Sequence, residues 1–171
     1  VFDFETWAKA AHDNNVPLII DNTFATPVLC RPFEWGADIV VHSTTKYMDG
    51  HAVQGGGAIV DSGNFDWEKV YKNTGKFADM VEPDESYHGL RYVADFGKAA
   101  YIVKARTQLM RDFGCYPAAQ SAFYLNMGLE TLPLRMERYC QNAKKVAAFL
   151  KDSDKIAKVA YPGLEGDEYY E

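Results

Sequence analysis

The sequence lacks the features that mark several large classes of protein. Cysteine is rare: only three occur, at positions far apart and in no CxxC pair. An odd number of scattered cysteines argues against a disulfide framework and favours a reduced, cytoplasmic protein. No apolar run approaches the roughly 20 residues that a membrane-spanning helix needs, and no signal peptide opens the chain.

Basic residues are also too few to suggest a polyanionic partner. The chain has 18 lysines and arginines against 24 aspartates and glutamates, a net charge of -6, and its lysines are dispersed. This balance gives no electrostatic case for binding nucleic acid or an anionic membrane. With 47% apolar residues in 171, the chain can build one sizeable core, so one domain is the first expectation.

Two apolar runs, each followed directly by polar residues, predict the functional region. Pro17–Ile20 is followed by Asp21, and Ile39–Val41 is followed by the sequence HSTTK, which ends at Lys46. Such β-branched runs indicate buried strands. Helical patterns alternate with them, which is typical of an α/β fold with a parallel sheet covered on both faces. Ligands of such sheets collect at the carboxyl ends of the strands, where these polar residues would lie.

The polar residues at these strand ends suit a phosphorylated carbonyl cofactor. The hydroxyls of Ser43 and Thr45 can donate hydrogen bonds to a phosphate, and Lys46 adds positive charge. A lysine held there could also trap a carbonyl group as an amine nucleophile. The Asp21 carboxylate needs a partner, and the protonated ring nitrogen of pyridoxal 5'-phosphate would be one. Together these residues predict a pyridoxal phosphate site.

Several segments of the sequence resemble one family of enzymes. Segments 21–27 (DNTFATP) and 36–47 (GADIVVHSTTKY) closely resemble the Cys/Met-metabolism pyridoxal-phosphate enzymes. This family includes cystathionine γ-synthase, cystathionine lyases, methionine γ-lyase and O-acetylhomoserine sulfhydrylase. Segments 60–67 (VDSGNFDW), 87–92 (YHGLRY) and 128–136 (GLETLPLRM) are most similar to the sulfhydrylase branch. The resemblance covers nearly the whole chain, over residues 4–163.

The resemblance implies a fold and a domain organisation. The fold would be α/β, the large cofactor-binding domain of the aspartate aminotransferase type (fold type I), with a mostly parallel sheet that is incomplete at both ends. Residues 1–150 would form the central and C-terminal part of this domain, including its long connecting helix. Residues 151–171 would start a small C-terminal domain. Members of the family are considerably longer, so we expect an internal segment of a larger enzyme, a cytoplasmic homotetramer with shared active sites.

The resemblance also implies a reaction and roles for individual residues. The reaction would be a γ-replacement in methionine biosynthesis, in which sulfide or methanethiol displaces acetate from O-acetyl-L-homoserine to give homocysteine or methionine. Lys46 would hold the cofactor covalently and act as the catalytic acid–base group. Asp21 would pair with the ring nitrogen, Thr23 would lie close to the ring, and Ser43 and Thr45 would also bind the cofactor. The alternatives are cystathionine γ-synthase, methionine γ-lyase or cystathionine lyase activity, or a non-catalytic structural subunit of the same fold.

Each of these residues also has a purely structural interpretation. Most lysines are solvated, an aspartate after a strand is often a turn residue, and hydroxyls often satisfy turn backbone. The histidines have no recognised metal-ligand spacing, so no metal site is predicted. Residues 51–54 (HAVQ) replace the glycine- and serine-rich stretch that commonly follows the lysine in the family, which leaves the loop geometry and thiol preference open. The ring-stacking aromatic residue and the substrate-carboxylate arginine of the family lie outside this segment.

The remaining patterns predict the elements around this region. Helices are expected over residues 4–13 (capped by Asp3), 66–72, 94–112 and 117–127 and from 132 onward, the last with Thr131 as N-cap. Strands are expected over residues 17–21, 38–41, 57–60 and 155–161, and a long loop over 75–92. In the first of these helices, Phe4, Trp7, Ala8 and Ala11 have the i, i+3, i+4, i+7 spacing of one helical face.

Overall fold

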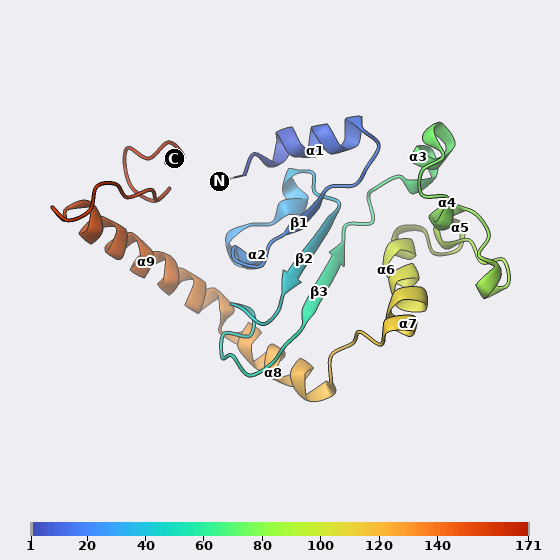
Figure 1. Ribbon diagram of the computed structural model, residues 1–171. Coiled ribbons are helices and arrows are strands. Elements are labelled where there is room, and N and C mark those ends of the chain that lie inside the picture. The colour runs from blue at the N-terminus through green and yellow to red at the C-terminus, as the bar shows by residue number, and fades with distance from the viewer. Residues whose placement is uncertain (1, 171) are drawn as a thin grey trace.

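The protein folds as helices arranged around a small mixed β-sheet in the computed structural model, which describes residues 2–170 (Figure 1). The strand order is β1 (Ile19–Asp21), β2 (Ile39–Ser43), β3 (Gly57–Asp61). β1 and β2 are parallel, as predicted, whereas β3 is antiparallel to β2. The sheet is mixed because the chain returns from β2 to β3 through a loop without a crossover helix, and a parallel strand would need one. The α/β class is confirmed.

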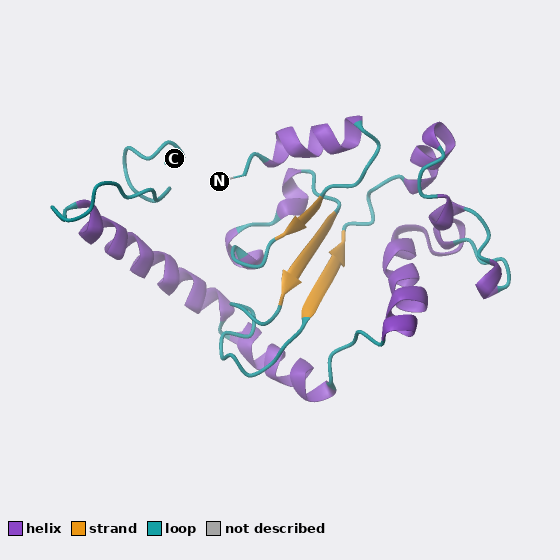
Figure 2. Cartoon of the chain, viewed as in Figure 1, coloured by secondary structure: helices purple, strands orange, loops and turns teal. Residues whose placement is uncertain are grey.

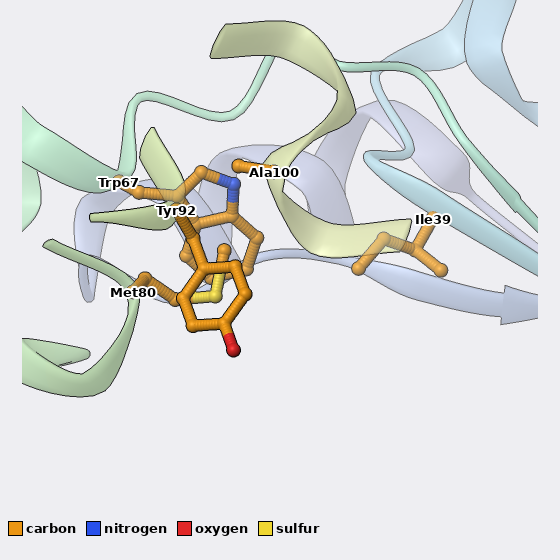
Figure 3. Packing of buried hydrophobic residues seen from close by; sticks show 5 residues of the cluster. All are labelled: Ile39, Trp67, Met80, Tyr92 and Ala100. Atoms are coloured by element: carbon orange, nitrogen blue, oxygen red, sulfur yellow. The ribbon is translucent and has the colours of Figure 1, made fainter. Parts of the chain in front are cut away.

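β2 is the central strand of this sheet and is buried on both faces. Ile39 and Val40 point to opposite faces, and their side chains are only 1% and 3% exposed. Ile39 belongs to the main core cluster, whose other buried members are Trp67, Met80, Tyr92 and Ala100 (Figure 3). Continuous apolar sequence in this strand follows from the burial of both faces.

The first helix, α1 (Phe4–Asp13), has the predicted boundaries. The Asp3 carboxylate accepts a hydrogen bond from the Thr6 backbone nitrogen at 3.1 Å, and Asn15 follows the helix with φ 57°. Trp7 belongs to the apolar spacing of this helix, yet it is 56% exposed and its ring stacks on that of Phe2. The small Ala8 is the buried residue of α1, because it packs directly against Gly36. If Gly36 had a Cβ atom, that atom would lie 2.9 Å from the Cβ atom of Ala8.

Short helices connect α1 and the strands. α2 (Thr26–Leu29) and the 3₁₀ helix η1 (Pro32–Trp35) lie between β1 and β2, and η1 ends at Gly36 with φ 91°. α3 (Trp67–Thr74) follows β3 and is capped by Asp66, whose side chain accepts from the Lys69 nitrogen at 2.9 Å. The helix predicted over residues 66–72 is therefore confirmed, although it begins one residue later and ends two residues later.

The segment predicted as a long loop over residues 75–92 contains helical turns, which is a correction. They are α4 (Ala78–Val81) and η2 (Glu85–Tyr87). They form because the Asp84 carboxylate accepts three hydrogen bonds that hold the segment together. The donors are the Ser86 backbone nitrogen, the hydroxyl of the fully buried Tyr92 at 3.0 Å and the side-chain amide of Gln108 at 2.5 Å. These partners lie far along the chain, so local turn signals did not reveal the order.

The single helix predicted over residues 94–112 is interrupted. The structure has α5 (Tyr92–Phe96), η3 (Gly97–Ala99), α6 (Ala100–Lys104), the π-helical turn η4 (Ala105–Met110) and α7 (Arg111–Phe113). The break falls at Gly97, whose φ of 53° and ψ of −121° suit only a residue without a Cβ atom. Within the π turn, the Thr107 carbonyl accepts a hydrogen bond from the Tyr87 hydroxyl, so the turn binds the preceding segment.

Two helices, α8 (Ala119–Glu130) and α9 (Leu132–Lys151), complete the described part of the chain and lie end to end beside the sheet (Figure 2). Thr131 does not cap α9 as predicted, because its backbone is already helical and its hydroxyl donates to the Gly128 carbonyl at 3.3 Å.

The strand predicted over residues 155–161 is also wrong. No strand in residues 2–170 pairs with that segment, which has an irregular backbone. Among the same residues, no helix has both the length and the apolar character needed to cross a membrane.

Candidate active site

The predicted site residues come from two adjacent strand ends. Asp21 ends β1 and pairs in register with Val41 of β2, so both strands finish at the same edge of the sheet. In Figure 1 the arrowheads of β1 and β2 point to this edge, where the turn after β2 approaches the junction of α8 and α9. The register thus places the residues after Asp21 beside those after Val41.

Thr23 connects the two strand ends by three hydrogen bonds. Its backbone nitrogen and its hydroxyl donate to Oδ1 of Asp21 at 3.0 and 2.5 Å, and its hydroxyl oxygen accepts from the Ser43 nitrogen at 2.7 Å. Since Thr23 is only 6% exposed, this arrangement is fixed within the protein interior. Within residues 2–170 no donor reaches the second oxygen of Asp21, Oδ2, so one carboxylate oxygen is oriented by the protein while the other stays available.

The Asp21 side chain is a carboxylate at all physiological pH values. The hydrogen bond from the Thr23 hydroxyl, and after it the bond from the Thr23 backbone nitrogen, lowers the pKa of Asp21 below its usual value. His42, the next residue of β2 after Val41, is buried, with only 5% of its surface exposed. Burial lowers the pKa of His42 despite the opposing effect of Asp21, so a neutral imidazole is favoured there.

The lysine follows β2 in a compact turn. The Ser43 and Thr45 hydroxyls are hydrogen-bonded to each other, and the Gly50 nitrogen donates to the Lys46 carbonyl at 2.8 Å. Thr44, 2% exposed, ties the turn to the following loop, because its nitrogen donates to the Gly56 carbonyl at 3.0 Å and its carbonyl accepts from Gln54 at 2.9 Å. The Lys46 side chain itself is exposed to solvent.

An open cavity of about 510 Å³ lies next to this turn. Its lining comprises Phe24, Thr45, Lys46, Tyr47, Gly50, His51, Ala52 and Tyr139. Of the predicted site residues, only Thr45 and Lys46 line the cavity, whereas Asp21, Thr23 and Ser43 form the hydrogen-bonded network beside it. The aromatic side of the cavity is continuous: the Tyr47 ring lies 6.1 Å from that of Phe24 and 5.1 Å from that of Tyr139.

Sequence reasoning missed the contribution of the helix α9 to this site. Tyr139 of α9 lines the cavity, and its ring meets that of Tyr47 there. Phe24 and Tyr47 stand within the recognised motifs, but no local pattern distinguishes an aromatic residue of a cavity wall from one of the core. Residues 51–54, which depart from the family pattern, include Ala52 at φ 56°, a conformation that a residue with a Cβ atom rarely adopts.

Comparison with known proteins identifies the family of this chain. The sequence profile named "Cys/Met metabolism PLP-dependent enzyme" matches residues 1–171. The chain belongs to this family. It is 47% identical over 176 aligned residues to O-acetyl-L-homoserine sulfhydrylase from Leptospira meyeri, covering 98% of this chain and 39% of that protein. It is 48% identical over 164 residues to homocysteine synthase from Schizosaccharomyces pombe, covering 95% and 38%.

A solved structure agrees with this assignment. The putative O-acetylhomoserine (thiol)-lyase from Campylobacter jejuni, which contains N'-pyridoxyl-lysine-5'-monophosphate, superposes with a TM-score of 0.88 at 36% identity. The match covers 99% of this chain and 40% of that one, so the chain spans about two fifths of the length of its relatives. The fold is therefore that of a fold type I pyridoxal-phosphate enzyme, and its cofactor is pyridoxal 5'-phosphate.

The residues at the strand ends fit this cofactor chemically. Oδ2 of Asp21 is an available anionic acceptor for a protonated ring nitrogen. The Thr45 hydroxyl and the Lys46 amine share the cavity beside it and match a phosphate and an aldehyde. The polar groups at this end of the sheet thus include partners for the ring nitrogen, the phosphate and the aldehyde of pyridoxal phosphate.

Proposed function

We propose that the protein is a pyridoxal-phosphate-dependent O-acetylhomoserine sulfhydrylase. It would replace the acetate of O-acetyl-L-homoserine with sulfide or methanethiol, giving homocysteine or methionine. One observation carries the proposal: at the ends of two adjacent strands, Asp21 has an available carboxylate oxygen and Lys46 has an exposed amine. The names of the relatives support the choice of reaction, since those at 45–48% identity include several sulfhydrylases and homocysteine synthases.

The proposal assigns the cofactor contacts to five residues. Lys46 holds the cofactor covalently and is the catalytic group. Asp21 pairs with the ring nitrogen through Oδ2 and is oriented by Thr23, which lies close to the ring. Ser43 and Thr45 bind the cofactor, and the hydrogen bond between their hydroxyls places both at the start of the lysine turn.

These residues divide the chemistry between them. Bound pyridoxal phosphate supplies an electron sink that makes the Cα proton of the substrate acidic. With its amine free, Lys46 would take the proton from Cα and then one from Cβ, and it would return both protons to these carbons after the thiol has replaced acetate. Asp21 keeps the ring nitrogen protonated, since its own low pKa keeps it ionised. Acetate leaves from Cγ with the bonding electron pair, and the thiol then forms the new bond at Cγ and gives up its proton.

The whole protein is proposed to be a cytoplasmic homotetramer with shared active sites. The cavity at Lys46 is open and, within residues 2–170, contains no arginine among its lining residues to bind a substrate carboxylate. Such a group would come from another part of the enzyme. Residues 1–150 are assigned to the large domain and 151–171 to the start of the small domain, in agreement with the end of α9 at Lys151.

Product analysis of the purified native enzyme tests the reaction. With O-acetyl-L-homoserine and sulfide we expect acetate and homocysteine in equal amounts, with little α-ketobutyrate. Replacing sulfide by methanethiol should give methionine, and omitting both thiols should stop most acetate release. α-Ketobutyrate as the main product would instead identify a γ-lyase, and cystathionine formed preferentially from cysteine would identify a cystathionine γ-synthase.

A further inference from the structure

The backbone of the lysine turn is held from outside by one guanidinium group. Arg135, in the first turns of α9, donates from Nη1 to the carbonyl of Tyr47 at 2.7 Å, and from Nη2 to the carbonyl of Gly128 at 2.6 Å. Its Nε donates to the Thr131 hydroxyl at 3.0 Å. All three nitrogens are engaged, so the plane of the guanidinium is fixed, and Tyr47 is the residue directly after Lys46.

Two glycines make this close approach possible. A Cβ atom on Gly50 would lie 2.6 Å from Cζ of Arg135, and one on Gly128 would lie 2.5 Å from the carbonyl oxygen of Met48. The turn thus packs with its bare backbone against both the guanidinium and the end of α8. Any larger residue at either position would displace the turn or the arginine.

α9 makes a second contact with the same residue of the turn. Tyr139 lies one helical turn beyond Arg135, on the same face of the helix, and its ring packs 5.1 Å from that of Tyr47. Arg135 therefore holds the carbonyl of Tyr47 while Tyr139 holds its side chain. With both fixed, the backbone that carries Lys46 has little freedom to turn its side chain away from the cavity.

We propose that Arg135 is a positioning residue for the reaction: by fixing the backbone of Tyr47 it orients the Lys46 amine. This inference rests on the proposed function, which makes Lys46 the reactive group. The competing role is purely structural, because the bonds to Gly128 and Thr131 would also join α8 to α9. The two roles differ in what happens to the turn itself when the guanidinium is removed.

The test uses the native enzyme with Arg135→Lys and Arg135→Met, and Arg138→Met as the matched control. Arg138 is an exposed arginine of the same helix and makes no hydrogen bond to residues 44–50 in the part of the chain that the structure describes. Lysine keeps the charge but not the planar fork. Because a displacement of about 1 Å at a reacting group can cost roughly 100-fold in rate, we expect kcat to fall by up to that factor with KM nearly unchanged.

Two further readouts do not depend on turnover. The apoenzyme of both Arg135 variants should bind pyridoxal phosphate about tenfold more weakly, which corresponds to the loss of one charge-assisted hydrogen bond. In the apoenzyme, amide hydrogen exchange at Asp49 and Gly50, whose nitrogens donate within the turn, should accelerate at least about tenfold. Arg138→Met should match the wild type in all three measurements.

Clear outcomes would overturn the inference. If Arg135→Lys keeps wild-type kcat, cofactor affinity and exchange of the turn, Arg135 does not position Lys46. If both variants lower only the unfolding temperature, and the three readouts are unchanged well below it, the arginine merely joins α8 to α9. Failure of the proposed function is separable: it would appear as turnover that survives substitution of Lys46, whatever the Arg135 variants do.

Discussion

The Lys46→Ala enzyme is expected to lose turnover almost completely. The substitution removes both the amine that binds the cofactor aldehyde and the acid–base group that moves protons on the substrate, and the second effect alone is worth about 10²–10⁴ in rate. Because Lys46 is exposed and its backbone bonds remain, the fold of the apoenzyme should not change. Steady-state rates of acetate release, at saturating O-acetyl-L-homoserine and sulfide, measure the loss.

The control for this experiment is Lys69→Ala, which removes an exposed lysine on α3. It should leave kcat and the unfolding temperature as in the wild type. Added methylamine, a small primary amine, should restore part of the proton-transfer activity of Lys46→Ala. If Lys46→Ala retains more than a few per cent of wild-type turnover, then Lys46 is not the catalytic lysine and the site assigned here is wrong.

The Asp21→Asn enzyme should fold normally but work poorly. Asparagine keeps Oδ1, so both donors of Thr23 retain their acceptor, and the network between β1 and β2 survives. What it loses is the negative charge that faces the ring nitrogen. Because this charge stabilises the protonated ring nitrogen on which the electron sink depends, a fall of roughly 10²–10³ in kcat/KM is expected.

The pH dependence of this effect follows from the direction of the Asp21 pKa. The pKa of Asp21 in the folded protein lies below its usual value of 3.8 because of the hydrogen bonds from Thr23. Asp21 is therefore fully ionised at any pH above the usual pKa of a carboxyl group. It loses its charge only as the pH falls through its own lowered pKa. The ratio of kcat/KM between wild type and Asp21→Asn should hence stay constant in assays from about pH 6 to about pH 9.

Asp13→Asn serves as the matched control, since it neutralises an exposed carboxylate at the end of α1 that pairs with Lys9. It should change neither kcat nor cofactor affinity. Equal activity of Asp21→Asn and wild type across the range would show that Asp21 has no role at the ring nitrogen. A variant that fails to fold would be recognised by its far-UV circular dichroism, and Asp21→Glu, which keeps the charge, would then be assayed in its place.

The sequence was sufficient for the parts of the site that depend on neighbouring residues. The strands ending at Asp21 and near Ser43 follow from β-branched runs, because such runs pack well when both faces of a strand are buried. The predicted carboxylate and lysine follow from their places after those strands. The α/β class and the family assignment are confirmed, whereas the roles of the individual residues stay predictions.

The features that the sequence did not reveal depend on contacts between distant segments. The bond from Arg135 to Tyr47 spans 88 positions, and no periodicity within α9 distinguishes this arginine from Arg138. Likewise the order of residues 75–92 depends on Asp84 reaching Tyr92 and Gln108. The apolar pattern over 155–161 resembles a strand, but a strand needs a pairing partner, and residues 2–170 offer none.

The most direct test of the account is chemical identification of the lysine that carries the cofactor. The native enzyme should be yellow, borohydride should bleach its visible band, and peptide mass mapping should place a pyridoxyl group on the peptide that contains Lys46. A pyridoxyl mass on another lysine would contradict the site. A protein that stays colourless even with added pyridoxal phosphate would contradict the enzyme assignment itself and favour a structural subunit of the same fold.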